Sequence, residues 1–168
     1  DRRGRPALQG RSGPAVAAAA AKATAPFRDL PRPMKGRPDC NFSFSGLKTA
    51  LRQRVDALRA ANAFDDMARA NLAAGFQQAV VDCLIDRTKH ALAMAKADHP
   101  TLSALVVAGG VAANQQLRAA LHELAGKHGL PVVAPPPRLC TDNAAMIAWA
   151  GIERFRLGEL SGFDYAPR

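Results

Sequence analysis

The stretch Val-Val-Ala-Gly-Gly-Val-Ala-Ala-Asn, residues 106–114, decides the fold of this chain. Its valines end an apolar run that predicts a short buried strand over residues 102–108, and its alanines begin a helix predicted over residues 112–127. Gly109 and Gly110 stand between the two. Glycines at such a junction let the backbone approach a ligand closely, and the start of a helix offers free amides to an anion or a sugar hydroxyl. A tight turn with no ligand fits the same pattern equally well.

A strand and a helix follow each other a second time. His128-Gly129 is typical of a helix C-terminus and closes the first helix. Residues 131–134 then predict another short strand, and a second helix is predicted over residues 142–157. The order strand, helix, strand, helix predicts an α/β unit with parallel strands.

Polar side chains stand at the start of both of these helices. Asn114 can donate and accept hydrogen bonds to a nucleoside, or it can lie on a solvated helix face. The second helix follows three prolines, Pro135 to Pro137, and begins with Thr141-Asp142-Asn143. Such a cluster caps the free amides of the first turn, but the same geometry suits a ligand or metal site. The cluster alone leaves both interpretations open.

The part of the chain before this unit predicts two long helices. Apolar residues recur at helical spacing over residues 47–61 and again over residues 65–97. Phe42 and Phe44 alternate with serines, which predicts a short strand that ends at Ser45-Gly46. This strand would place its aromatic side chains in the core, although the serines and the following lysine could also contact a phosphate or RNA.

Residues 1–40 form a lead-in of different composition, rich in Ala, Arg and Pro. They hold six of the twelve prolines, so we expect them to be mostly extended, apart from an Ala-rich helix over residues 15–25. They also carry nine basic and three acidic residues, which is +6 of the net charge of +9. Residues 41–168 carry the remaining +3. The charge is thus compatible with an anionic partner, but it does not predict a broad basic face on the folded part.

Cysteine and histidine spacing argues against two kinds of site. The three cysteines are odd in number and form no Cys-x-x-Cys pair, which makes a disulfide scaffold or structural zinc unlikely and favours a reducing compartment. No histidine pair has the spacing His-x-x-x-His. No uncharged apolar stretch reaches the length of about 18 residues that a membrane span needs. The residues concerned are Cys40, Cys83, Cys140, His90, His99, His122 and His128.

Three stretches in this order, residues 41–49, 106–118 and 135–155, resemble the C-terminal half of the tRNA N6-adenosine threonylcarbamoyltransferase family, formerly described as O-sialoglycoprotein endopeptidases. The resemblance covers about residues 13–168. It implies an α/β fold, the second lobe of an actin-like, Hsp70-like or sugar-kinase-like architecture, with the two long helices as a helical insertion. By this resemblance residues 1–40 are a lead-in with part of a nucleotide loop, and residues 41–168 are the C-terminal lobe.

The activity that the resemblance implies is an acyl transfer. Family members move a threonylcarbamoyl group from threonylcarbamoyl-adenylate to N6 of the tRNA adenosine beside the anticodon. Gly13, Gly109, Gly110 and Asn114 would then bind the nucleotide, and Asp142 would be a metal ligand. The metal, iron or zinc in the family, would hold and polarise the threonylcarbamoyl group. The implied partners are tRNA, the adenylate and companion proteins of the pathway, without a membrane.

The chain departs from the family pattern at several points. The family's His-x-x-x-His metal motif belongs to an N-terminal half, so we expect the other metal ligands to lie outside this chain. Asn41 stands where the family usually has Asp, and Ala144 where it usually has Gly. The alternative function is a non-catalytic remnant of the family that binds nucleotide or acts as a scaffold. The expected location is the cytoplasm, with the mitochondrion as the alternative.

Overall fold

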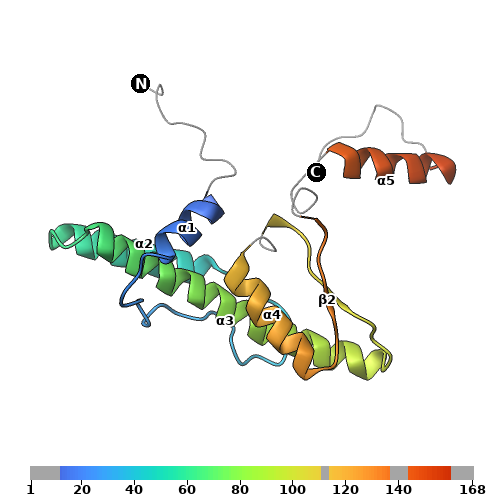
Figure 1. Ribbon diagram of the computed structural model, residues 1–168, viewed down its shortest axis with the longest axis horizontal. Helices are drawn as coiled ribbons and strands as arrows, with labels where there is room; N and C mark the ends of the chain where they lie inside the picture. Colours follow the sequence, from blue (N-terminus) through green and yellow to red (C-terminus); the bar gives the residue numbers. More distant parts are fainter. Residues whose placement is uncertain (1–11, 111–113, 137–143, 160–168) are drawn as a thin grey trace.

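The computed structural model describes residues 12–110, 114–136 and 144–159 of the 168-residue chain. Its elements, in chain order, are α1 (Ser12–Ala20), α2 (Ser45–Ala60), α3 (Asp66–Asp98), β1 (Leu105–Val106), α4 (Gln115–Lys127), β2 (Val132–Val133) and α5 (Ala144–Arg156). Figure 1 shows α3 as the long central element along which α1, α2 and α4 pack. The predicted helices over residues 47–61 and 65–97 are confirmed as α2 and α3.

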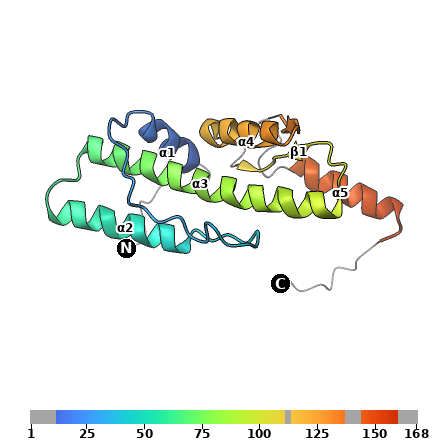
Figure 2. The same ribbon diagram turned by 90° about the horizontal axis from the view of Figure 1, so that it is seen from below.

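Helix α3 is buried on more than one side because different elements cover it. Figure 2 shows α2 on one side of α3, with α1 and α4 on the other. On the α2 side, Leu30, Leu47 and Ala79 form one buried cluster. On the α4 side, Val81 packs with two leucines of α4, Leu117 and Leu121. Each fully buried leucine contributes about 1.5–3 kcal/mol relative to an exposed one, so these contacts fix both neighbours on α3.

The two strands form a small parallel sheet, as the order of elements predicts. Leu105 pairs with Val132 and Val106 with Val133, and α4 is the crossover between them. The strands are shorter than the predicted runs over residues 102–108 and 131–134. Within the described part of the chain no third strand joins this sheet, and each of its two strands contributes two residues. The predicted stop at His128-Gly129 is confirmed: His128 is the C-cap of α4, and Gly129 has a φ of +68°.

The predicted strand at Phe42 to Ser45 is wrong. Residues 41–44 have no regular structure, and α2 begins at Ser45. Local hydrogen bonds explain the difference, because the Asn41 backbone amide donates to Asp39 Oδ1 (2.8 Å) and the Ser45 amide to Ser43 Oγ (3.3 Å). Phe44 packs against the cluster at Leu47, whereas Phe42 is 55% exposed.

Residues 23–44, which we call the strap, cross α3 from α1 to the start of α2 (Figure 2). Near its beginning, the backbone amides of Thr24 and Ala25 both donate to Asn71 Oδ1 (3.1 and 3.0 Å), and the amide of Phe27 donates to the carbonyl of Asn71 (3.2 Å). A Cβ atom at Gly75 would meet the Phe27 carbonyl carbon at 3.0 Å and its oxygen inside van der Waals contact. The absence of a side chain at Gly75 therefore lets the strap lie directly on α3.

Ion pairs and hydrogen bonds hold the later part of the strap. The backbone amide of Gly36 donates to Asp86 Oδ2 at 3.0 Å. Arg87, whose side chain is 3% exposed, pairs with Asp86 and donates to the carbonyl of Asp39 at 2.6 Å. The strap thus follows α3 over its middle turns. The lead-in helix predicted over residues 15–25 is found as α1, which begins three residues and ends five residues earlier, and the domain division at residue 40 stays a prediction.

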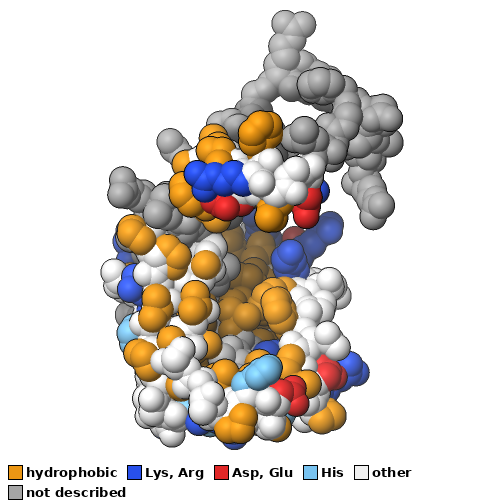
Figure 3. All heavy atoms as spheres, turned by 90° about the vertical axis from the view of Figure 1, so that its right-hand side faces the viewer, with side chains coloured by type: hydrophobic (Ala, Val, Ile, Leu, Met, Phe, Trp, Pro, Cys, Tyr) orange, Lys and Arg blue, Asp and Glu red, His pale blue; other side chains and the backbone are white. Residues whose placement is uncertain are grey.

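Helix α5 lies apart from the other helices in Figure 1, and none of its residues is buried. Its start was predicted at residue 142, which lies outside the described residues. Figure 3, which faces this side of the molecule, shows hydrophobic side chains around a hollow next to it. Among the helices that the structure describes, none has the length and apolar character needed to cross a membrane.

Candidate functional site

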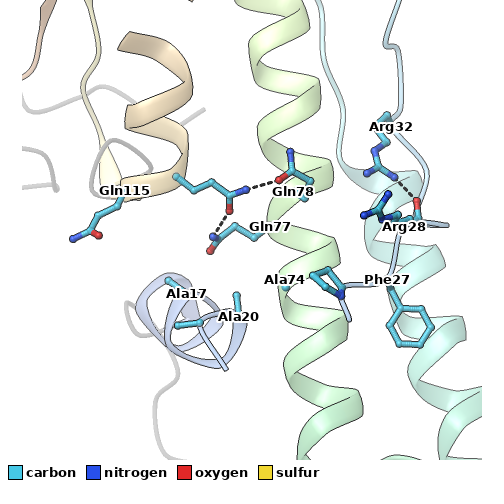
Figure 4. Close-up of a pocket in the computed structure, with 12 residues that line it drawn as sticks. Ala17, Ala20, Phe27, Arg28, Arg32, Ala74, Gln77, Gln78 and Gln115 are labelled. Atoms are coloured by element: carbon cyan, nitrogen blue, oxygen red, sulfur yellow. Dashed lines mark hydrogen bonds between the residues drawn. The ribbon is translucent and has the colours of Figure 1, made fainter. Parts of the chain in front are cut away.

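A cleft of about 740 Å³ lies where α1, α3 and α4 meet the first part of the strap. This volume falls within the range of about 300–1,000 Å³ that small-molecule sites occupy. Figure 4 shows Ala17 and Ala20 of α1 on one wall and Gln115 at the start of α4 on another, with Gln77 and Gln78 of α3 between them. The lining residues are Ala17, Ala20, Ala21, Pro26, Phe27, Arg28, Arg32, Ala74, Gln77, Gln78, Gln115 and Gln116.

Asn114 is the N-cap of α4, at the edge of this cleft. Its backbone is extended, and its Oδ1 accepts a hydrogen bond from the Leu117 backbone amide at 3.0 Å. Its Nδ2 donates to Gln77 Oε1 at 3.1 Å. The sequence predicted either a nucleoside contact or a solvated helix face, and neither describes Asn114 fully, because it is partly buried and caps the helix. An asparagine amide has two N–H groups and two oxygen lone pairs, so one donor and one acceptor position remain beyond these two bonds.

A directional chain of amide hydrogen bonds runs from Asn114 along the floor of the cleft. Gln77 Nε2 donates to Gln116 Oε1, and Gln116 Nε2 donates to Gln78 Oε1. Gln78 Nε2 then donates to Asp82 Oδ1 at 2.7 Å. Each amide accepts on one side and donates on the other, and the chain ends on a carboxylate that can only accept. This arrangement fixes the orientation of every amide in it. We call it the amide relay.

The far end of the amide relay is cationic. Arg32 Nε donates to Asp82 Oδ2 at 3.0 Å, so this carboxylate is bound from both sides. Arg32 also donates to the carbonyl oxygens of Arg28 and Leu30. The side chain of Arg28 is exposed and lines the cleft beside it. The cleft therefore presents neutral amides at the α4 end and guanidinium groups at the strap end.

None of the three predicted glycines is among the lining residues of this cleft. Gly13 is in the first turn of α1, before the residues of that helix that form the wall. Gly109 follows β1 with a φ of +84°, in the left-handed region that favours glycine. Among the described residues, no atom beyond the chain neighbours lies within 4 Å of where a Cβ would stand at Gly109, Gly110 or Gly13. These backbone positions are therefore open to a ligand.

The predicted metal ligand Asp142 lies outside the described residues, as do Thr141 and Asn143. Within the part of the chain that the structure describes, no group of three or more His, Cys, Asp or Glu side chains is placed to hold a metal ion. The residues described here thus do not form a metal site by themselves. Ala144, at the position where the family usually has Gly, is the first residue of α5 and is exposed.

Two groups of α3 beneath the strap have perturbed pKa values. Burial alone would raise the pKa of Asp86, but hydrogen bonds from Arg87 and from the Gly36 amide, together with the nearby positive charge, hold the pKa of Asp86 below its ordinary value. Burial, and then the carboxylate of Asp82, raises the pKa of the Cys83 thiol. Cys83 is therefore a protonated core residue, consistent with the absence of a disulfide in the described part of the chain.

The lining of the cleft suits binding better than catalysis. Its polar groups are amides and guanidiniums, and the lining residues include no carboxylate, histidine or thiol that could act as a general base or nucleophile. Amides can recognise the polar edge of a base or the hydroxyls of a sugar. Guanidiniums pair with phosphate. The arrangement therefore fits a nucleotide that is held here while reaction takes place on atoms outside the lining.

Sequence reasoning did not identify the amide relay. Gln77 and Gln78 interrupt an apolar stretch of α3, and Gln115-Gln116 follows Asn114 directly. The available signal was a pair of uncharged polar residues within an apolar stretch of a predicted helix. Such residues need partners, and amides on a neighbouring helix are the partners that satisfy both their donors and acceptors.

Comparison with known proteins identifies the family. Residues 5–149 match the family model described as tRNA N6-adenosine threonylcarbamoyltransferase. The chain is 51% identical over 150 residues to the protein of that name from Gluconobacter oxydans, which covers 88% of this chain and 40% of the relative. It is 54% identical over 157 residues to the one from Paracoccus denitrificans, and this match covers 93% of this chain and 43% of the relative. It is 52% identical over 156 residues to the one from Rhodospirillum rubrum, with the same two coverages.

The chain spans about two fifths of the length of these curated relatives. The matched residues include the strap, α2, α3, the β1–α4–β2 unit and the start of α5. The predicted glycines and Asn114 also lie within the match. The chain therefore belongs to the tRNA N6-adenosine threonylcarbamoyltransferase family.

Proposed function

We propose that this chain supplies the adenosine-binding part of an enzyme that transfers a threonylcarbamoyl group from threonylcarbamoyl-adenylate to N6 of the tRNA adenosine beside the anticodon. The reaction forms a bond between the adenine N6 and the carbamoyl carbon, breaks the bond from that carbon to the AMP phosphate, and releases AMP and a proton. The observation that carries the proposal is the cleft between α1, α3 and α4, bounded by Asn114 at one end and Arg28 at the other.

In this proposal the cleft receives the adenosine of the adenylate. The amide relay fixes the orientation of Asn114, which contacts the nucleoside with its remaining donor and acceptor positions. Gly109 and Gly110 let the backbone approach the ligand, and Gly13 does the same from α1. Arg28, exposed beside the cleft, pairs with the phosphate.

The metal and the partners belong to this proposal as well. We assign Asp142 as the one ligand that this chain gives to an iron or zinc ion, with the remaining ligands on the other lobe. A single carboxylate holds such an ion weakly, so the site is complete only between the two lobes of an actin-like fold. tRNA and companion proteins of the pathway are the proposed partners. The proposed location is the cytoplasm, with the mitochondrion as the alternative.

The test uses a form of the protein that spans the full length of its relatives. It is incubated with unmodified tRNA and with threonylcarbamoyl-adenylate made from radiolabelled threonine. We expect label to enter the tRNA, and we expect Asp142→Ala to abolish this transfer. Asp29→Ala is the matched control, because Asp29 is an exposed carboxylate outside the cleft lining.

Two results would count against the proposal. Transfer that survives Asp142→Ala unchanged would remove the metal assignment. No transfer by the full-length protein, combined with AMP binding by this chain, would leave the alternative of a nucleotide-binding protein without the transfer activity.

A further inference from the structure

We propose that the strap and α2 form an RNA-binding face, on which Phe42 stacks with an unpaired base while basic side chains of α2 contact the phosphates of the same strand. The choice of RNA as the occupant rests on the proposed function, in which tRNA is a substrate. Helix α2 and the part of the strap that leads into it lie on the α2 side of α3 (Figure 2). The first part of the strap, which includes Arg28 and Arg32, lines the cleft among α1, α3 and α4 instead.

The first observation is the distribution of charge. The strap and α2, residues 23–60, carry eight basic and three acidic side chains, a net charge of +5. Helix α3 carries four of each and is neutral, and α4 and α5 each carry +1. In the described part of the chain, the positive excess is therefore concentrated in the strap and α2. The sequence did not predict this face, because division at residue 40 separated two segments that the fold brings together.

The second observation is that most of these cations are available. Seven of the eight basic side chains are exposed, and Arg32, in its ion pair with Asp82, is the exception. Arg28, one of the seven, lines the cleft. Arg52 has an ion pair with Asp56 at 3.9 Å, but both side chains are more than half exposed, so water screens the pair and Arg52 can exchange this partner for a phosphate. An exposed cluster with so few internal partners attracts a polyanion.

The third observation is the order of the cations along α2. Lys48, Arg52 and Arg59 are separated by four and seven residues, which places them on one stripe of the helix. Their Cα atoms are spaced by roughly 6 and 10 Å along the helix axis at a rise of 1.5 Å per residue. Such a row can follow several successive phosphates of one strand. Lys48 lies in the first turn, where its backbone amide donates to the carbonyl of Phe44 at 2.9 Å.

The fourth observation is an exposed aromatic ring just before the start of α2. Phe42 is 55% exposed, although it belongs to a sequence pattern that predicts a buried strand. Its ring leans on Phe44 with 5.6 Å between centroids, and Phe44 packs into the core at Leu47. The exposed ring is therefore supported from behind and ready for a second stacking partner. Basic side chains beside an exposed aromatic ring are the combination by which proteins bind unpaired nucleotides.

Two further rings support guanidinium groups of α2, although Arg54 lies on another side of the helix than the stripe of Lys48, Arg52 and Arg59. The Arg54 guanidinium lies over the ring of Phe27, 4.8 Å from the centroid, and that of Arg59 lies over Phe64 at 5.2 Å. Stacking of this kind restricts the side chain without neutralising it. A cation that is held in place loses less entropy when it binds a phosphate.

The experiment measures binding of this chain to a fluorescent RNA hairpin that has the sequence of an anticodon stem-loop, by fluorescence anisotropy over a series of salt concentrations. Removal of one basic side chain of α2 should weaken binding and make the slope of log affinity against log salt less negative by about 0.7–1. The three substitutions are Lys48→Ala, Arg52→Ala and Arg59→Ala. Phe42→Ala should weaken binding about 5- to 100-fold and leave this slope unchanged. Circular dichroism of each variant checks that it is folded.

Two variants serve as matched controls. Lys127→Ala removes an exposed cation from α4, on the other side of α3, and Phe155→Ala removes an exposed ring from α5. Both should bind RNA as the parent chain does. The assignment of the face would be overturned if Lys127→Ala weakened RNA binding as much as the α2 variants do. It would also be overturned if Phe155→Ala weakened RNA binding as much as Phe42→Ala does. Complete displacement of the RNA by polyglutamate of equal charge, with no effect of Phe42→Ala, would show a site for acidic chains instead.

AMP binding by the same variants separates this inference from the proposed function. The α2 variants should bind AMP with unchanged affinity, because none of the substituted residues lines the cleft. RNA binding without AMP binding would support the face and count against the proposed function of the cleft. AMP binding without any RNA binding would overturn the face and leave the cleft proposal intact.

Discussion

The side-chain amide of Asn114 donates to Gln77 at 3.1 Å, and this bond joins the N-terminus of α4 to the middle of α3. The same asparagine caps α4 through its oxygen. One residue thus combines a structural role with a position at the edge of the cleft. The sequence interpretations offered a nucleoside contact or a solvated helix face for Asn114, whereas in the structure it caps α4 and lies at the edge of the cleft.

We predict that Gln77→Leu weakens AMP binding to this chain several-fold, measured by calorimetry. Leucine removes the acceptor for Asn114 and leaves Gln116 without its donor, and an unsatisfied buried polar group costs about 1–3 kcal/mol. Gln53→Leu is the control, because Gln53 is an exposed glutamine on α2. If both variants bound AMP like the parent chain, the amide relay would have no part in the site.

Two substitutions at Asn114 separate capping from ligand contact. Asn114→Ala should lower the free energy of unfolding by about 1 kcal/mol, since alanine cannot cap α4. Asn114→Asp should retain most of this stability, because aspartate is an equally good cap and its charge suits a helix N-terminus. Both should weaken AMP binding, because neither alanine nor aspartate has a side-chain N–H to donate to the nucleoside.

Urea unfolding and calorimetry on the two Asn114 variants provide the measurement. If Asn114→Ala lost both stability and AMP affinity while Asn114→Asp kept both, Asn114 would act only as a cap.

Backbone packing at Gly75 yields a prediction about stability. Gly75→Ala should lower the free energy of unfolding by about 1–3 kcal/mol, because the new methyl group collides with the Phe27 backbone and displaces the strap. Gly126→Ala in α4 is the control. It has open space around it among the described residues and should stabilise the helix by up to about 1 kcal/mol. Equal effects of both substitutions in urea unfolding would contradict the close contact between the strap and α3.

The strap should also make stability depend on acid pH. The pKa of Asp86 is below its ordinary value in the folded chain, so its contribution is present above the unfolded pKa of about 3.9 and is lost as pH falls through the folded pKa. Asp86→Asn should therefore be less stable at pH 7, where the buried Arg87 loses its nearer carboxylate and keeps that of Asp39 at 3.9 Å. It should also lose less stability than the parent chain on acidification.

The measurement for Asp86 is the urea midpoint between pH 7 and pH 3. Asp66→Asn is the control, because the ion pair of Asp66 with Arg69 is exposed and contributes little. A parallel acid dependence in the parent chain and in Asp86→Asn would exclude Asp86 as a cause of acid sensitivity.

Local patterns predicted the helices of this chain well, and the partners of its strands poorly. The apolar spacing that predicts α2 and α3 is a property of each helix alone, and so is the glycine stop at Gly129. A strand needs a neighbour, and no residue within Phe42 to Ser45 shows whether one is present. That segment therefore alternates like a strand and yet folds as irregular backbone.

The candidate site was predictable only where one residue carried a signal. Asn114 stands out because it follows two glycines at a junction between a strand and a helix. Gln77 and Gln116 lie 39 residues apart, and their meeting depends on how α4 packs across α3. The basic face was hidden for the same reason, since the strap and α2 differ in composition and are joined only by the fold.

Binding of AMP in the cleft is the most direct test of the account. The measurement is a titration of the ¹⁵N-labelled chain with AMP, followed by NMR of the side-chain amides. The account predicts that the signals of Asn114, Gln77 and Gln116 shift together and saturably, whereas that of Gln53 on α2 stays in place. Unchanged signals of the three cleft amides at millimolar AMP would contradict the assignment of this cleft as the adenosine site.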